Sequence, residues 1–403
     1  MTASALAGQI AASAAPQATL SCMVGETIMT KLISRRRVLA GATNVVGAST
    51  LLLSRPLCGL AQTPKPITVG FIYAATRNDF GWNQAHAVAA KRIAQLPGVK
   101  LIEQERVPET VEVERVMESM IQLDGAKVVF PTSFGYWPFI QKIAPKYPDV
   151  LFVHAGGLWK DTDPKNTIGY RGYMEEPHYL CGIAAGMMSK TGKLGFLGSK
   201  PLYFIFNNCN GFVMGARSVR PDATCQVVIT GDWDNPVKEA ETVNSLVDQG
   251  VDVIVANVDS PKVAVETAER RGIMSCGYHT DLSTLAPNGF LTGAEWNWAK
   301  GGDFVQAWQT GAAYPNLFRG GFRQNMVAIS PFGNKVPKNV QESVLAARQG
   351  FIDDTLKLYK GPLKDNKGNQ VLAAGQEIAN TDNPFKLSVK WLVEGAIGST
   401  GLQ

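Results

Sequence analysis

The sequence predicts an α/β protein with two similar lobes, each built on a mainly parallel β-sheet covered by helices on both faces. Short apolar runs alternate with helical patterns along most of the chain. The runs are continuously apolar, which is typical of parallel strands buried on both faces. The alternation restarts near residue 173, and 403 residues with 45% hydrophobic content suffice for two cores.

The first set of alternating elements lies between Ile67 and about residue 172. The expected strands are ITVGFIY, VKLIEQERV, AKVVFPTS, VLFVHAGG and TIGYRGY. The expected helices between them are NQAHAVAAKRIAQL, VEVERVMESMIQLDG and WPFIQKIAPKYP. In the first helix, apolar residues recur on a helical period, which predicts one buried face: Ala85, Val88, Ala89, Ile93 and Leu96.

The second set repeats this order up to the strand GFLTGAEWNW. Its other strands are KLGFLGS, TCQVVITG, VDVIVANV and IMSCGYHTD, and its helices include EEPHYLCGIAAGMMSK and FNNCNGFVMGARSV. From about Ala299 we expect a helix, the segment NMVAISPFG, another helix and a hairpin at KDNKGNQVLA. We predict an N-terminal lobe of residues 66–172 plus about 297–328, and a C-terminal lobe of 173–296 plus about 329–403.

Residues 1–61 are expected to be a leader. Within 29–61, the motif SRRRVLA precedes an apolar run of about 16 residues and then small residues, which is the layout of a twin-arginine export signal. The run is shorter than the ~20 residues of a spanning helix, so we expect cleavage and a periplasmic protein. Leu57 precedes Cys58 where a lipoprotein signal needs a small residue, which argues against lipid anchoring.

The charge distribution gives no reason to expect nucleic-acid binding. The net charge of +5 comes mostly from the leader, where five basic residues face only Glu26. The remainder is close to neutral, and such a body does not attract a phosphate backbone.

The cysteines beyond the leader give no metal or redox motif. Cys181, Cys209, Cys225 and Cys276 lack CxxC spacing, which excludes zinc-ribbon and thioredoxin-like readings. We expect small buried side chains, and a disulfide between Cys209 and Cys225 stays an open alternative.

Aromatic residues gather at or just after the carboxyl ends of the predicted strands. Ligands of open α/β sheets bind at this edge. A single aromatic there is usually core or lid packing, whereas a set spread over both halves indicates a binding cleft. The set contains Trp82, Tyr136, Trp137, Tyr203, Phe204, Trp233, Tyr278, Trp296 and Trp298.

From about Pro66 to Gln403 the chain resembles the basic membrane protein (BMP) family, substrate-binding components of bacterial ABC importers that include purine nucleoside receptors. The segments that carry the resemblance include NDFGWNQAH, HYLCGIAAGMMSKTGKLGFLGS, GYHTDLSTLAP and WLVEGAIG. The resemblance implies the type I periplasmic-binding fold, with two Rossmann-like lobes, three crossover strands and a ligand in the cleft between them.

The resemblance also implies site residues. The family motif D-K-x-F-N appears here as Asp79 to Asn83, with Trp82 in place of the aromatic. The motif Gly-Tyr-His-x-Asp ends here at Asp281. Trp296 or its neighbour aligns with a lysine of the nucleoside-binding relatives, which favours a free base over a nucleoside.

A purine has flat apolar faces and a polar edge, so its site needs an aromatic clamp and a few amide or carboxylate partners. Stacking one base contributes ~1–3 kcal/mol. We expect Trp82 to supply one face and Trp233 or Phe204 the other. We expect Asn83 and Asp281 to read the edge, although Asn83 is equally suited to cap the helix that follows. The full predicted set is Asp79, Trp82, Asn83, Tyr136, Phe204, Trp233, Asp281 and Trp296.

The sequence therefore predicts a monomeric solute-binding protein that delivers a purine or related heterocycle to an ABC permease. It predicts no catalytic residues, no metal site and no cofactor. Alternatives are a periplasmic sensor that uses the same pocket, a binder of a riboflavin-type ligand and a nucleoside hydrolase. The hydrolase would need a paired-carboxylate or metal site, and no such motif is present.

Overall fold

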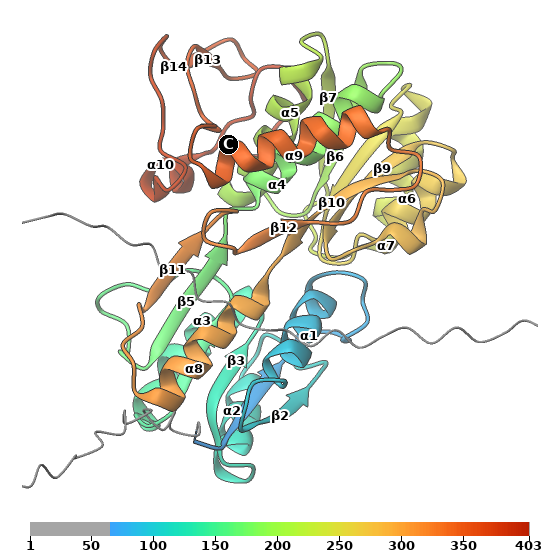
Figure 1. The fold of residues 1–403 in the computed structure, drawn as a ribbon. Coiled ribbons are helices and arrows are strands. Elements are labelled where there is room, and N and C mark those ends of the chain that lie inside the picture. Colours follow the sequence, from blue (N-terminus) through green and yellow to red (C-terminus); the bar gives the residue numbers. More distant parts are fainter. Residues whose placement is uncertain (1–64, 403) are drawn as a thin grey trace, which may run out of the picture. The chain divides into compact units, whose positions relative to one another are not determined.

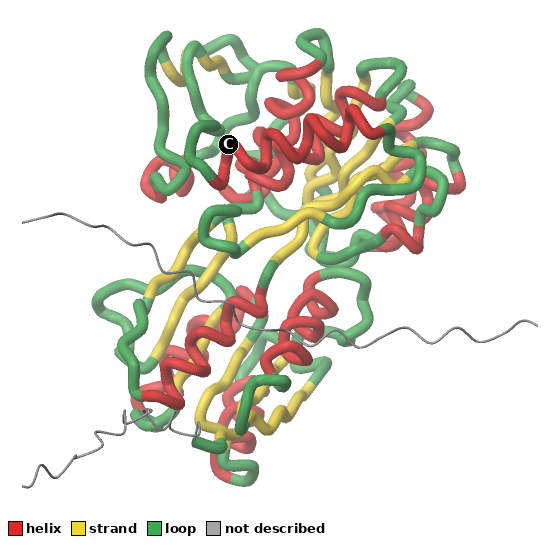
Figure 2. The backbone as a smooth tube through the Cα atoms, in the orientation of Figure 1, coloured by secondary structure: helices red, strands yellow, loops and turns green. Residues whose placement is uncertain are grey.

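The computed structural model describes residues 65–402. The predicted leader and its twin-arginine signal lie outside the described residues. Within them, the chain forms two large sheets and a small hairpin, with helices between most successive strands of the two sheets (Figures 1 and 2).

The first sheet contains six strands in the order β11-β5-β4-β3-β1-β2, and every neighbouring pair is parallel. The strands are β1 (Ile67–Ile72), β2 (Val99–Gln104), β3 (Ala126–Pro131), β4 (Leu151–His154), β5 (Thr167–Gly172) and β11 (Leu317–Gly320). The helices of this lobe are α1 (Trp82–Ile93), α2 (Glu112–Gln122), α3 (Trp137–Ile143) and α8 (Gly302–Thr310).

The continuously apolar strands of this sheet are buried on both faces, as the sequence predicts. Along β1, Val69 and Phe71 pack in one apolar cluster with Ile93 of α1 and Phe304 of α8. Ile72 packs in a separate cluster with residues of α2 and α3. Because alternate side chains of a strand point to opposite faces, the sheet needs helices on both sides.

The second sheet has seven strands in the order β12-β10-β9-β8-β6-β7-β15, parallel except for the pair β10–β12. Its strands are β6 (Lys193–Gly198), β7 (Thr224–Ile229), β8 (Val253–Asn257), β9 (Met274–His279), β10 (Phe290–Trp296), β12 (Val327–Ile329) and β15 (Ala396–Ile397). Its helices are α4 (Glu175–Met188), α5 (Tyr203–Val219), α6 (Pro236–Asp248), α7 (Lys262–Arg270) and α9 (Lys338–Ile352).

The chain passes three times between the sheets, as expected for the type I periplasmic-binding fold. It crosses after β5 into α4, after β10 into α8, and between β11 and β12. In Figure 1 the paired strands β5 and β11 run side by side toward the second sheet. The strand β11 was not predicted from the sequence, because LFRG carries too short an apolar run.

The C-terminal segment returns to the second sheet. The predicted hairpin forms from β13 (Leu363–Lys364) and β14 (Gln370–Leu372), and α10 (Asn383–Ser388) follows it. The two-residue strand β15 then pairs with β7 at the sheet edge.

Two further properties bear on the sequence predictions. All four cysteines of the described segment are free and buried, so Cys209 and Cys225 are not joined by a disulfide. No helix in residues 65–402 has the length and apolar character needed to cross a bilayer.

Candidate functional site

A cavity lies between the two lobes, with about 450 Å³ of space that includes its opening to solvent. Both lobes contribute aromatic side chains to its wall. Its lining consists of Trp82, Glu109, Ser133, Phe134, Arg171, Ser199, Phe204, Ile205, Trp233, Asn257, Asp259, Tyr278 and His279.

The fold places these residues at the carboxyl ends of parallel strands. Ser133 follows β3, Ser199 follows β6, Asn257 ends β8, and His279 ends β9. This is the edge of an α/β sheet at which ligands bind, because loops and helix N-termini converge there. The aromatic pattern in the sequence predicted this edge.

Trp82 is the first residue of α1, and its indole closes one side of the cavity. Its Nε1 donates a hydrogen bond to the carbonyl oxygen of Thr132 at 3.1 Å. Its ring meets the rings of Trp296 and Trp298 edge-on, with centroids 5.7 and 5.4 Å away. These contacts fix the indole in one orientation, so it presents a rigid surface to the cavity.

Trp296 lies behind Trp82 and does not line the cavity itself. Its indole stacks on Trp298 with ring centroids 4.4 Å apart, and its Nε1 donates to Nδ1 of His279 at 2.9 Å. Trp296 therefore supports the cavity wall, whereas the sequence analysis expected it in direct contact with ligand.

The loop before α1 is organised by Asp79. Its carboxylate accepts backbone hydrogen bonds from Gly81, Asn83 and Gln84 at 2.9 to 3.0 Å. Such a carboxylate satisfies the free N–H groups of a helix N-terminus and interacts favourably with the helix dipole. The carboxylate of Asp79 therefore caps the N-terminus of α1, a role that the sequence analysis left open for Asn83 beside ligand contact.

The side-chain amide of Asn83 forms its hydrogen bonds within the same loop. Its Nδ2 donates to Asp79 at 2.7 Å, and its Oδ1 accepts from the backbone of Ala75 at 3.3 Å. Asn83 and Asp79 line a wider opening beside the cavity, together with Asp259 and Asp234, but neither lines the cavity itself.

The carboxylate in the cavity wall belongs to Asp259, two residues after β8. Among the described residues its side chain has no hydrogen-bond partner and no ion pair. Removal from water, followed by the nearby charges of Asp79, Asp234 and Glu109, raises its pKa well above the ordinary value. A carboxyl group without a partner in a cavity is suited to a ligand that offers N–H donors.

The sequence analysis missed Asp259 and selected Asp281 instead. Asp281 lies on an exposed loop after β9, where its carboxylate accepts from the backbone of Ser283 at 2.9 Å, and it lines no part of the cavity. The available signal was the position of Asp259 directly behind the buried strand VIVAN.

His279 is held in an unusual backbone conformation, with φ at +76°, which is strained for a residue other than glycine. Its Nε2 lies 2.9 Å from the carbonyl oxygen of Val258, and its Nδ1 accepts from Trp296. Both ring nitrogens are thereby satisfied in the neutral tautomer, and burial lowers its pKa well below the usual range. His279 presents its ring, not a free nitrogen, to the cavity.

Phe204 and Trp233 provide aromatic surface from the second lobe. Their rings are parallel within 4°, with centroids 6.3 Å apart. The guanidinium of Arg171 lies 4.0 Å from the ring centroid of Phe204, a cation–π contact. Together these three residues give the cavity a flat aromatic surface beside a cation.

Tyr136 is a further predicted site residue that does not line the cavity, as is also the case for Asp79, Asn83, Asp281 and Trp296. It is fully buried in the core of the first lobe, in the apolar cluster with α2 and α3. Its hydroxyl donates to the carbonyl oxygen of Val107 at 2.5 Å. The position of an aromatic residue after a strand does not show whether its ring points into the core or into the cleft.

The fold and the cavity together define a two-lobe ligand-binding protein. The family model described as Bmp, ABC transporter substrate-binding protein PnrA-like, matches residues 67–346. The chain therefore belongs to this family of ABC transporter substrate-binding proteins, whose members are not enzymes.

Comparison with individual proteins agrees with this assignment. A purine-binding protein of Brucella abortus is 33% identical over 84% of this chain and 95% of its own length. A Haloferax volcanii protein, whose name refers to an ABC transporter and to glucose binding, is 28% identical over 76% of this chain and 77% of its own length. An ABC transporter solute-binding protein of Conexibacter woesei shares the fold, with a TM-score of 0.62 and 21% identity over 73% of this chain and 98% of that one.

Proposed function

We propose that this protein binds a purine base or a closely related heterocycle between its lobes and delivers it to an ABC permease. The observation that carries the proposal is the aromatic-lined cavity with an unpartnered carboxyl group, Asp259, in its wall. Flat aromatic surfaces stack on a heterocycle, and a carboxyl group accepts from ring N–H and exocyclic amine groups. The purine-binding protein of Brucella abortus supports this choice by similarity.

Each predicted site residue except Asp281 takes a role in this proposal. Trp82, Phe204 and Trp233 provide the stacking surface, and Asp259 takes the edge-reading role expected of Asp281. Trp296 holds Trp82 in place, while Asp79 and Asn83 order the loop that carries Trp82. Tyr136 packs in the core of the first lobe and stabilises it.

A sugar is the alternative suggested by the Haloferax volcanii relative. Sugar sites combine an aromatic platform with many hydrogen-bonding groups for hydroxyls. In this cavity several polar side chains are already paired, including those of His279 and Ser133. The free polar groups that remain suit a heterocycle with few polar edge groups better than a polyol.

The protein acts outside the cytoplasmic membrane in this proposal. The motif SRRRVLA and the apolar run behind it support export through the twin-arginine route, followed by cleavage near residue 61. It works as a monomer, with lobe boundaries near residues 172 and 296 and again between β11 and β12, where closure takes place.

The test is a ligand panel on the processed protein. Isothermal titration calorimetry with adenine, guanine, hypoxanthine, adenosine, riboflavin and glucose should give the tightest binding to a purine. The ~8 kcal/mol of micromolar affinity is within reach of two stacked faces and several edge contacts. Preferential binding of glucose or riboflavin would refute the purine assignment.

A further inference from the structure

A second cavity, of about 400 Å³, adjoins the first at Arg171 and Phe204, which line both. It lies beside the crossover strands and α10, and it is bordered by charged and amide side chains. The remaining lining residues are Gly172, Tyr173, Met174, Glu175, Tyr203, Asn207, Asn208, Arg319, Asn383, Lys386 and Leu387.

Two arginines of this cavity stand side by side. Arg171 on β5 and Arg319 on β11 are direct partners in the parallel pairing of these strands, so their side chains leave the same face. Like charges at directly opposed positions destabilise a sheet unless a counter-charge lies between them. Neither arginine forms an ion pair with any residue of the described segment.

Arg171 is the more buried of the two arginines, and only 8% of its surface is exposed. Its guanidinium carries five N–H donors, yet it makes no hydrogen bond within residues 65–402, and it lies over the aromatic faces of Phe204 and Trp296. Arg319 has hydrogen bonds to the carbonyl oxygen of Gly157 alone. The free N–H donors of both guanidinium groups therefore face the cavity, where an acceptor on a ligand can reach them.

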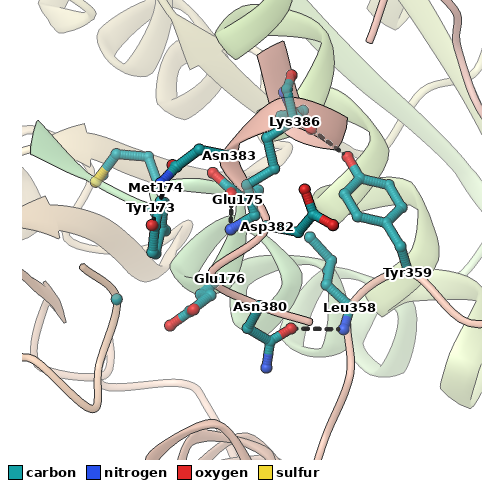
Figure 3. A network of polar contacts seen from close by, with 12 residues as sticks. Tyr173, Met174, Glu175, Glu176, Leu358, Tyr359, Asn380, Asp382, Asn383 and Lys386 are labelled. Carbon is teal, nitrogen blue, oxygen red and sulfur yellow. Dashed lines mark hydrogen bonds and ion pairs between the residues drawn. The ribbon is translucent and has the colours of Figure 1, made fainter. Parts of the chain in front are cut away.

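The other charged pair of the cavity cannot supply that acceptor. Lys386 of α10 forms an ion pair with Glu175 of α4 at 2.5 Å, and both side chains are nearly inaccessible (Figure 3). Its ammonium also lies 3.5 Å from the ring centroid of Tyr173. Glu175 is thereby neutralised, and the two arginines leave the cavity with an excess of positive charge.

We infer that this second cavity is an oxyanion subsite, in which Arg171 and Arg319 hold a phosphate or carboxylate group of the same ligand molecule whose heterocycle occupies the aromatic cavity. Paired guanidinium groups match the oxygens of such a group in geometry and charge. The inference rests on the proposed function and narrows its ligand class to heterocycles with an anionic substituent, such as a purine nucleoside monophosphate.

The experiment compares a matched series by calorimetry: hypoxanthine, inosine and inosine monophosphate, with inorganic phosphate as a further probe. We expect the monophosphate to bind at least about tenfold more tightly than hypoxanthine at low salt. This gain should shrink as ionic strength rises, whereas hypoxanthine binding should change little.

Arg319→Gln is the informative variant, because Arg319 lines only the second cavity. It should remove the gain of the monophosphate and leave the dissociation constant of hypoxanthine unchanged, and Arg319→Lys should restore part of the gain. Arg323→Gln is the matched control, since Arg323 is an exposed arginine outside both cavities. Unfolding temperatures of the free variants separate a lost contact from a damaged fold.

The outcomes separate the two proposals. If hypoxanthine binds but the monophosphate gains nothing, or if its gain survives Arg319→Gln, the oxyanion subsite is wrong and the proposed function stands. If inorganic phosphate binds through Arg319 while the monophosphate gains nothing, an anion is bound but is not part of the ligand, which also overturns the inference. If no member of a purine series binds, the proposed function and the inference fail together.

Discussion

At the scale of single residues, the cavity wall contains two kinds of polar side chain. Some form all their hydrogen bonds within the protein, and others have donors or acceptors without a partner. His279 and Trp296 satisfy each other and the carbonyl oxygen of Val258. The side chains of Asp259 and Arg171 have no hydrogen-bond partner among the described residues, although both line the cavity. The paired groups therefore build the wall, and the unpaired groups are the ones left to contact a ligand.

Trp233 allows a direct test of the stacking surface, because it is partly exposed and packs at the margin of the apolar core. Trp233→Ala should weaken ligand binding by ~1–3 kcal/mol, the typical contribution of stacking a base on an aromatic ring. Calorimetry measures the loss. Trp159→Ala is the matched control, since Trp159 is also partly buried but lies outside the cavity, and equal losses in both variants would contradict the clamp.

Glu176 gives a pH-dependent prediction. Burial raises its pKa to about 7, and the nearby charge of Lys386 and a hydrogen bond from the backbone of Phe322 offset this only in part. The folded state therefore keeps a proton that the unfolded chain, with a pKa of 4.5, has released. The free energy of unfolding should fall as the pH rises from about 4.5 to about 7.

The variant Glu176→Gln should flatten that dependence, because an amide cannot ionise but can still accept from Phe322. Thermal unfolding of both proteins between pH 5 and pH 8 measures the difference. A wild-type unfolding temperature that declines in parallel with that of Glu176→Gln would mean that Glu176 is not the titrating group.

At the scale of elements, the loop before α1 and the loop after β8 hold the lobes together across the mouth of the cleft. The backbone N–H of Trp82 donates to the carbonyl oxygen of Asp259 at 2.9 Å, and the hydroxyl of Ser260 donates to the carbonyl oxygen of Asp79 at 2.7 Å. These bonds join the two lobes directly, so opening the cleft must break them.

Gly81 is the residue that permits this approach. A Cβ atom at Gly81 would lie 1.8 Å from the carbonyl oxygen of Asp259, which is far inside van der Waals contact with a backbone atom. Gly81→Ala should therefore hinder closure and weaken ligand binding by at least about tenfold, with little effect on the unfolding temperature of the free protein.

Small-angle X-ray scattering of the Gly81→Ala variant with and without ligand should report an expanded particle in both states. Ser260→Ala is the companion variant: it removes one of the two bonds without adding bulk, so its effect should be smaller. Unchanged affinity in Gly81→Ala would show that this contact is not needed for binding.

At the scale of the whole molecule, the C-terminal segment binds back onto the crossover between the lobes. Figure 3 shows Lys386 of α10 reaching Glu175 at the start of α4, with Tyr359 and Asn383 close by. Asn207 of α5 joins the same region, accepting a hydrogen bond from the hydroxyl of Tyr359. Residues beyond the family match at 346 thus complete the second cavity.

Breaking this buried pair should destabilise the protein strongly. Lys386→Met leaves the carboxylate of Glu175 buried without its partner, which typically costs about 3–5 kcal/mol. The double variant Glu175→Gln/Lys386→Met should recover much of that loss, because no buried charge remains. Urea unfolding curves provide the comparison.

The matched control is Lys360→Met, which breaks an ion pair of similar length, 2.8 Å to Glu377, but at an exposed position. Exposed pairs contribute about 0–1 kcal/mol, so this variant should unfold almost as the wild type does. If Lys386→Met were equally mild, the α10 segment would not depend on the pair.

The sequence by itself determined the two-lobe α/β architecture, because continuously apolar strands such as VIVAN can be buried only between two layers of helices. It also determined the edge at which ligand is expected, since aromatic residues follow strand ends in both halves. Both predictions use the spacing of apolar and aromatic residues along the chain. This spacing can be seen in the sequence without knowing how the elements pack.

Only the tertiary structure decided which of these residues meet. It buried Tyr136 in the core, left Asp281 on the surface, assigned the helix cap to Asp79 and brought Asp259 into the cavity. It also paired Arg171 with Arg319, which are 148 positions apart in the chain. Such contacts depend on strand order and on the direction of each side chain, and a single sequence does not encode either of them locally.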